Sequence, residues 1–154
     1  QMRERRIPRV LPVATGYDGS SFGTRIDPFT GRRSQHEGVD FVAPTGTPIL
    51  AAAGGVVVAA EWHNEYGNMI DIDHGNGLKT RYAHASKSLV RAGDIVRPGQ
   101  MIARVGSTGR STGAHLHFEV HVNGLPRNPN GFLNAAVPAP LAEALSPTNR
   151  TAIR

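Results

Sequence analysis

The chain has 154 residues and a formal net charge of +5, with 18 glycines, 11 prolines and no cysteine. This length predicts one domain with a buried core, and the absence of cysteine excludes disulfides and cysteine-based metal sites. The positive charge favours an anionic partner, such as nucleic acid, acidic lipid or an anionic cell-wall polymer, without choosing among them.

The first 15 residues are basic and carry Pro8 and Pro12, which predicts an extended arm or a linker. A nucleic-acid-binding arm would carry interleaved aromatic residues, and this segment has none, so we expect no nucleic-acid partner. No apolar run approaches the ~20 residues of a membrane span, so any export signal, membrane anchor or regulatory segment would lie upstream of the given chain. In Ser21–Gly31, two turn signals and little periodicity predict an ordered surface loop.

Short strands separated by turn residues are predicted over most of the remaining chain. They cover Val39–Val42, Ile49–Ala52, Gly55–Trp62, Asn68–Asp73, Leu78–His84 and Met101–Val105. The link His74-Gly75-Asn76-Gly77 is typical of a tight β-hairpin, because Asn and Gly tolerate the positive φ that such turns require. Helical periodicity is missing until Leu141–Leu145, which could form a short turn of helix. The pattern therefore predicts an all-β domain built on a small antiparallel sheet.

The stretch Gly113–Val122 alternates polar and apolar residues, which predicts a half-buried strand. One face would carry His115, His117, Glu119 and His121, and the inward face would carry Leu116, Phe118, Val120 and Val122. Two imidazoles about 7 Å apart on one face could divide metal coordination and proton transfer between them. The same alternation would also place histidines on a solvated face.

A second cluster favours the metal interpretation. His36 and Asp40 lie four positions apart, and both residue types bind zinc. Together with one histidine of the Gly113–Val122 stretch they would form a three-ligand set with a fourth position open for water.

Other polar residues give weaker signals. The glycine spacing of Gly106–Gly113 suggests a phosphate-binding loop, but the segment lacks the Lys-Ser/Thr ending and runs into a strand, so we interpret it as a flexible crossing. His63, His74 and His84 each have the context of an ordinary surface or partly buried residue. His121 would lie about 13 Å from His117 along the strand, too far to bind the same metal ion.

Taken together, these motifs resemble the LytM or lysostaphin-like zinc metallopeptidases, peptidase family M23. The family's HxxxD pattern is matched by His36 and Asp40, its YxH pattern by Tyr82-Ala83-His84, and its TGxHLHFE pattern by Thr112–Glu119. Further similarity lies in Phe22–Pro28, Ala43–Pro48 and Tyr66–Asn68; the departures are Ala114 for proline and Ala85 for leucine, and neither removes a functional group. The resemblance divides the chain into a basic arm (1–19), a peptidase domain (20–133) and a C-terminal tail (134–154).

The resemblance implies an antiparallel fold with a substrate groove and one Zn2+ per chain, bound by His36, Asp40 and His117. It implies that His84 and His115 orient water or stabilise the oxyanion. The expected activity is hydrolysis of peptide cross-links in bacterial peptidoglycan, at the bond between D-alanine and meso-diaminopimelate, by a monomer in the periplasm or outside the cell. Two alternatives remain: a non-catalytic relative that binds the wall and activates another hydrolase, and a basic polyanion-binding domain with incidental histidines.

Overall fold

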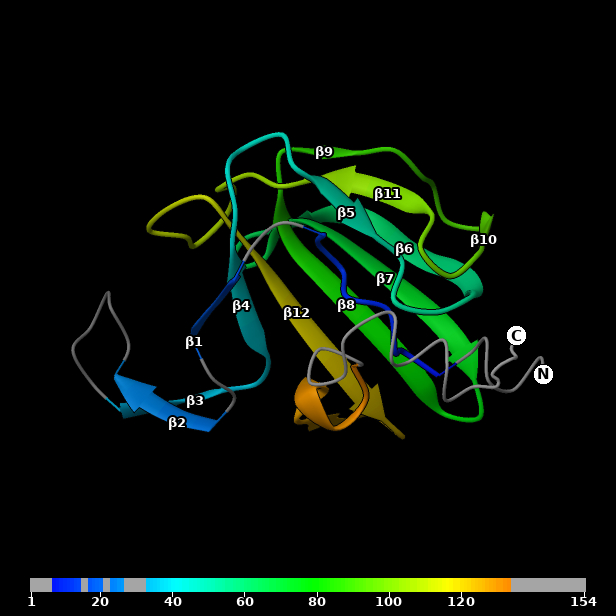
Figure 1. The fold of residues 1–154 in the computed structure, drawn as a ribbon, viewed down its shortest axis with the longest axis horizontal. Helices are drawn as coiled ribbons and strands as arrows, with labels where there is room; N and C mark the ends of the chain where they lie inside the picture. Colours follow the sequence, from blue (N-terminus) through cyan, green and yellow to red (C-terminus); the bar gives the residue numbers. More distant parts are fainter. Residues whose placement is uncertain (1–6, 15–16, 21–22, 27–32, 134–154) are drawn as a thin grey trace.

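The computed structural model describes residues 7–14, 17–20, 23–26 and 33–133, with residues 17–20, 23–26 and 33–36 described by their backbone alone. Antiparallel β-strands make up nearly all of the regular structure in these ranges (Figure 1), which confirms the predicted fold class. The only helix among the described residues is a short 3-10 turn, η1 (Pro129–Gly131). None of them forms a helix long and apolar enough to cross a bilayer.

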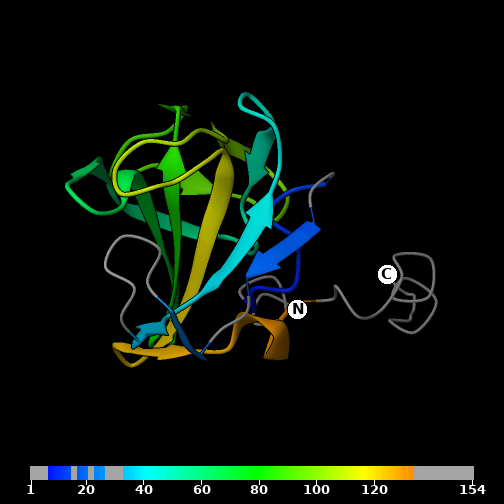
Figure 2. The same cartoon turned by 90° about the vertical axis from the view of Figure 1, so that its left-hand side faces the viewer.

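An eight-stranded sheet forms the body of the molecule. In spatial order its strands are β1 (Tyr17–Ser20), β4 (Val39–Val42), β12 (His115–Val122), β8 (Leu78–Ala85), β7 (Gly67–Gly75), β6 (Gly55–His63) and β10 (Ile95–Val96), with β13 (Leu125–Arg127) paired to β12. A second sheet contains β5 (Pro48–Leu50), β11 (Met101–Arg104) and β9 (Lys87–Ser88), and β2 (Gly23–Ile26) pairs with β3 (Arg33–His36). Figure 2 shows β4 and β12 side by side.

The apolar face of β12 packs into the core that joins the two sheets. Leu116, Phe118 and Val120 are fully buried there, together with Ile49 and Ile102 of the second sheet. The predicted inward face is therefore confirmed for these three residues of β12. A half-buried strand would leave the opposite face accessible, but His117 and Glu119 are also buried, and the side chain of Tyr66, from the turn before β7, lies against both.

The β7–β8 hairpin has the predicted turn. Gly75 pairs with Leu78, so Asn76 and Gly77 alone make the loop, and their φ angles are 53° and 80°. These two positive values match the turn type that suits the twist of paired strands. The sequence signal therefore located this hairpin correctly.

The N-terminal region is more ordered than the sequence indicated. Residues 7–14, predicted as part of an extended arm, lie along the body: Val13 joins the core, and the Val10 N–H donates to the Ala52 carbonyl. Within Ser21–Gly31 the loop prediction is wrong for 23–26, which form β2, whereas 21–22 and 27–31 lie outside the described residues. The predicted turn at Leu141–Leu145 also lies outside them.

His74 corrects another prediction, because it is a core residue of β7 and is 1% exposed. Its Nδ1 donates to the Gly54 carbonyl at 2.7 Å, and its Nε2 lies 2.8 Å from Thr80 Oγ1. Thr80 Oγ1 in turn contacts the Tyr82 hydroxyl at 2.8 Å, and that hydroxyl accepts the Ala52 N–H at 2.9 Å. Polar groups buried in this way persist because each has a partner.

Replacing Tyr82 by phenylalanine should lower the free energy of unfolding by about 1–3 kcal/mol, because it leaves the buried Ala52 N–H without an acceptor. Urea unfolding followed by circular dichroism measures the change. Thr47→Val is the control, since the Thr47 hydroxyl donates to Pro44 where water can replace it, and its cost should stay below about 0.5 kcal/mol. Equal costs for the two variants would contradict the role given to Tyr82.

Candidate active site

The pairing of β12 with both of its neighbours brings the polar residues together. His117 lies opposite Asp40 of β4 on one side and opposite Ala83 of β8 on the other. His84 follows Ala83 directly, and His115 precedes His117 on the same face of β12. Residues that are far apart in the sequence therefore meet at one place on the sheet.

Gly38 allows the segment before β4 to approach β12 closely. A Cβ atom at this position would collide with the main-chain carbonyl of Phe118 and crowd the side chain of Glu119. Any other residue would push Asp40 away from His117, so the glycine of the His36–Asp40 motif has a steric reason.

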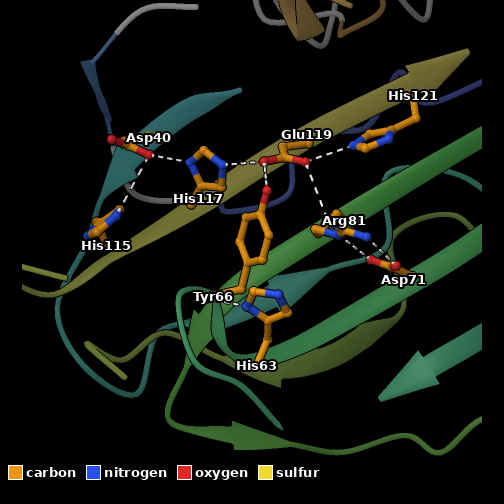
Figure 3. Close-up of polar contacts among 9 residues, drawn as sticks. All are labelled: Asp40, His63, Tyr66, Asp71, Arg81, His115, His117, Glu119 and His121. Carbon is orange, nitrogen blue, oxygen red and sulfur yellow. Dashed lines mark hydrogen bonds and ion pairs between the residues drawn. The ribbon is translucent and has the colours of Figure 1, made fainter. Parts of the chain in front are cut away.

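His117 lies between two carboxylates (Figure 3). Its Nδ1 is 2.8 Å from Asp40 Oδ1, and its Nε2 is 2.7 Å from Glu119 Oε2. Burial alone would lower the pKa of His117, but the hydrogen bonds to Asp40 and Glu119 raise it to about 9. Burial would raise the pKa of Glu119, but the hydrogen bonds from His117 and His121 hold it well below its ordinary value.

His84 and His115 lie beside this pair. The ring of His84 is 4.8 Å from that of His115 and 6.0 Å from that of His117, measured between ring centroids. His115 Nε2 lies 3.7 Å from Asp40 Oδ1, and its Nδ1 donates to the Gly113 carbonyl at 2.8 Å. Three imidazoles therefore lie together, and two of them, those of His115 and His117, approach the Asp40 carboxylate.

The backbone of His84 takes an unusual conformation, with φ of 64°. Non-glycine residues seldom adopt this conformation, and it persists where the surroundings fix it, which is common at functional sites. The His84 N–H donates to the Tyr66 carbonyl at 2.6 Å, and its Nδ1 donates to the Thr108 carbonyl at 2.7 Å. Burial, together with the nearby imidazoles of His115 and His117, lowers the pKa of His84 to about 4 despite the bond to Thr108, so this ring is neutral near pH 7.

The donor set fits a divalent cation. Glu119 can only accept, so His117 Nε2 carries a proton and, in the neutral ring, the Nδ1 lone pair is directed at the Asp40 carboxylate. His117 Nδ1 and Asp40 Oδ1 are then two acceptors 2.8 Å apart, so a positive charge must lie between them. Either a proton or a metal ion can supply it. Among the described side chains no group of three His, Asp or Glu residues forms a complete metal cluster, and the third predicted ligand, His36, has its side chain outside the described residues.

The structure places the remaining candidates elsewhere. His63 accepts the Glu65 and Tyr66 N–H groups in the β6–β7 turn, and His121 donates to Glu119 Oε1 at 2.7 Å instead of reaching Asp40. The segment Gly106–Gly113, predicted as a flexible crossing, is docked at its centre: Thr108 Oγ1 donates to the Ala85 carbonyl and accepts the Asn68 N–H.

Sequence reasoning did not assign a function to Glu119, Tyr66, Arg81 or Thr108. Glu119 could have been found from the alternation, since it lies two residues after His117 on the same strand face. Tyr66 reaches the site from the turn before β7, and Arg81 reaches it from β8. Only the strand register reveals these two positions. Thr108 acts through a main-chain carbonyl, which any residue type could supply.

Comparison with known proteins identifies close relatives. A family model described as peptidase family M23 matches residues 34–129. The DD-carboxypeptidase/endopeptidase Mpg of Neisseria meningitidis serogroup B is 46% identical over 131 residues, which are 85% of this chain and 30% of that protein. The peptidoglycan DD-endopeptidase ShyC of Vibrio cholerae is 43% identical over 122 residues, 79% of this chain and 27% of that protein.

The fold of a solved structure is similar to that of this chain. A zinc-containing peptidase from Vibrio cholerae has a TM-score of 0.73 and 41% identity to this chain, and the match covers 78% of this chain and 38% of that one. The chain spans less than a third of the length of the two related proteins above.

Asp40→Asn should lower the pKa of His117 in metal-free protein, because it removes the carboxylate that faces Nδ1. In the unaltered protein, the raised pKa of His117 stabilises the fold fully below about pH 6.5, and this stabilisation is lost as the pH rises through about 9. The variant, with a lower pKa of His117, should therefore lose less stability between these two pH values. NMR titration of the His117 ring and urea unfolding across this range measure both effects. The exposed Glu37→Gln is the control, and an equal pKa decrease there would refute the explanation.

Proposed function

The chain belongs to peptidase family M23, and from this we propose that it is a zinc-dependent endopeptidase that hydrolyses peptide cross-links in bacterial peptidoglycan. The observation that carries the proposal is the site itself: His117 Nδ1 faces the Asp40 carboxylate at 2.8 Å, with the rings of His84 and His115 alongside. Such a set combines a cation-binding pair with neutral imidazoles that can handle protons.

His36, Asp40 and His117 are the proposed ligands of one Zn2+. Two imidazoles and one carboxylate are a typical protein ligand set for catalytic zinc, with a further position open. The backbone of His36 ends β3, and only two residues separate it from β4, which keeps it near the start of the strand that carries Asp40. When bound, zinc supplies a Lewis acid that polarises the scissile carbonyl and makes water more acidic.

His84 and His115 are the proposed proton-handling residues. Each ring donates Nδ1–H to a main-chain carbonyl, that of Thr108 for His84 and that of Gly113 for His115. In the neutral ring Nε2 then carries the lone pair, ready to accept a proton from the attacking water and pass it to the leaving amine. The main-chain bonds fix both tautomers before any substrate binds.

The proposed substrate bond joins D-alanine to meso-diaminopimelate. The descriptions of two relatives support this choice: one is a DD-carboxypeptidase/endopeptidase, and the other is a peptidoglycan DD-endopeptidase. The net charge of +5 would favour approach to an anionic wall. We accordingly propose that the chain acts as a monomer in the cell envelope, in the periplasm or outside the cell.

Metal analysis of four single variants tests the assignment of roles. His117→Ala and Asp40→Ala should each strip the zinc from the purified protein, because each removes one of three ligands. His84→Ala and His115→Ala are the matched controls: they should keep about one zinc per chain and lose on the order of 10² or more in turnover. Zinc retained in both ligand variants would overturn the assignment, and zinc lost in His115→Ala but kept in His117→Ala would show that these two histidines have exchanged roles.

Digestion of purified sacculi tests the substrate. Murein containing meso-diaminopimelate should be converted from cross-linked dimers to monomers, whereas pentaglycine bridges should stay intact, as mass spectrometry of the new termini will show. Activity on intact sacculi should fall with salt more than activity on a small soluble peptide, because salt screens attraction between the basic chain and the wall. Pentaglycine cleavage with untouched dimers would disprove the choice of bond and leave the peptidase proposal standing.

A further inference from the structure

Glu119 is a buried carboxylate that the proposed mechanism does not use. It lies in the middle of β12, is 1% exposed, and has His117 on one side and His121 on the other. Burying a charged group is costly unless it is paired and hydrogen-bonded. Figure 3 shows how this cost is met, because donors or a positive charge are directed at Glu119 by the side chains of His117, Tyr66, His121 and Arg81.

Both oxygens of Glu119 are occupied. Oε2 accepts from His117 Nε2 at 2.7 Å and from the Tyr66 hydroxyl at 2.8 Å. Oε1 accepts from His121 Nε2 at 2.7 Å and lies 3.9 Å from Arg81 Nη1. The carboxylate therefore cannot rotate without breaking contacts on both sides.

Arg81 is itself fixed in place. Its Nε and Nη2 form a two-bond ion pair with Asp71 at 2.8 and 2.9 Å, and its guanidinium lies 4.8 Å from the centroid of the Tyr66 ring. Asp71, Arg81 and Glu119 thus form a series of alternating charges that runs across β7, β8 and β12 to the ring of His117. The series ends at the ring that faces Asp40.

The contact with Glu119 determines what His117 can do. Because a carboxylate only accepts, the proton shared with Glu119 stays on Nε2, and when a cation replaces the proton between Nδ1 and Asp40, the Nδ1 lone pair is directed at that cation. The negative charge behind the ring also makes Nδ1 a stronger electron donor. A reversed tautomer would direct an N–H group at the position of the cation.

We propose that Glu119 is the positioning residue of the metal site: held by Tyr66, His121 and Arg81, it fixes the tautomer of His117 and strengthens Nδ1 as a ligand. The inference rests on the proposed function, since it assumes that His117 binds zinc. It adds that the affinity for zinc is set partly by residues that never touch the metal.

Zinc affinity of the whole purified chain tests the inference, measured by competition with a chromogenic chelator. Glu119→Gln should weaken zinc binding about 10- to 100-fold, because the charge behind His117 is lost. Tyr66→Phe removes one hydroxyl that holds Glu119 and should weaken binding by a smaller factor, about 3- to 10-fold. Glu61→Gln, which removes an exposed carboxylate on β6, is the control and should leave the affinity unchanged.

A second measurement separates positioning from a structural role. In zinc-loaded protein labelled with nitrogen-15, the His117 ring should carry its proton on Nε2, and this proton should exchange faster with solvent in Glu119→Gln and in Tyr66→Phe. Urea unfolding of the metal-free variants reports any loss of stability independently. If Glu119→Gln does not fold, the Tyr66→Phe affinity decides the question.

The outcomes are distinguishable. If the unaltered chain binds no zinc, the proposed function fails and this inference fails with it. If the unaltered chain binds zinc and both variants bind it equally well, the proposed function stands and the positioning role is refuted. Weaker binding in both variants, with the Glu61→Gln control unchanged, supports the role.

Discussion

The pairing of β12 with β4 and β8 is the constraint on which the rest of the structure depends. Because side chains alternate along a strand, a slip of one residue in either ladder would turn His117 into the core and Phe118 towards Asp40. The register is held by the apolar side of β12, where Leu116 and Phe118 are fully buried between the two sheets. The hydrophobic core therefore determines where the polar groups meet, and the polar groups need no separate scaffold.

The polar side of β12 buries several charged groups, each of which lies next to a group of opposite charge or a hydrogen-bond partner. Glu119 faces the rings of His117 and His121, and Arg81 is paired with Asp71. Removing one member of such a series leaves an uncompensated charge in a region with little water, which is far more costly than replacing an exposed ion pair. Substitutions on this side of the sheet should consequently be costly, even where a residue is several ångströms from the reacting groups.

Local sequence patterns predicted the features that depend on local geometry. Alternation over Gly113–Val122 identified β12 and its two faces, and Asn76-Gly77 identified the β7–β8 turn. Patterns could not show what covers a second face, so the burial of His117, Glu119 and His74 was missed. The role expected of His84, which has no distinctive local context, came from family resemblance, as did the choice of which histidine of β12 binds the metal. The hydrogen bond from His84 to Thr108 could not be predicted for another reason: its acceptor is a main-chain carbonyl, which every residue type has.

The distance along the chain between Asp40 and His117, 77 residues, has a consequence for how activity and folding are linked. The β7–β8 hairpin closes through a two-residue turn and needs no distant partner, whereas the two groups that face each other at the site meet only when β4 and β12 have both joined the sheet. A partly folded chain that keeps its β7–β8 hairpin but leaves β4 unpaired does not bring these two groups together. Any ligand held between Asp40 and His117 therefore binds only the complete fold and stabilises it by RT ln(1 + [L]/Kd). A chain in which either strand is left unpaired therefore lacks both this pair of groups and the stabilisation that a bound ligand would add.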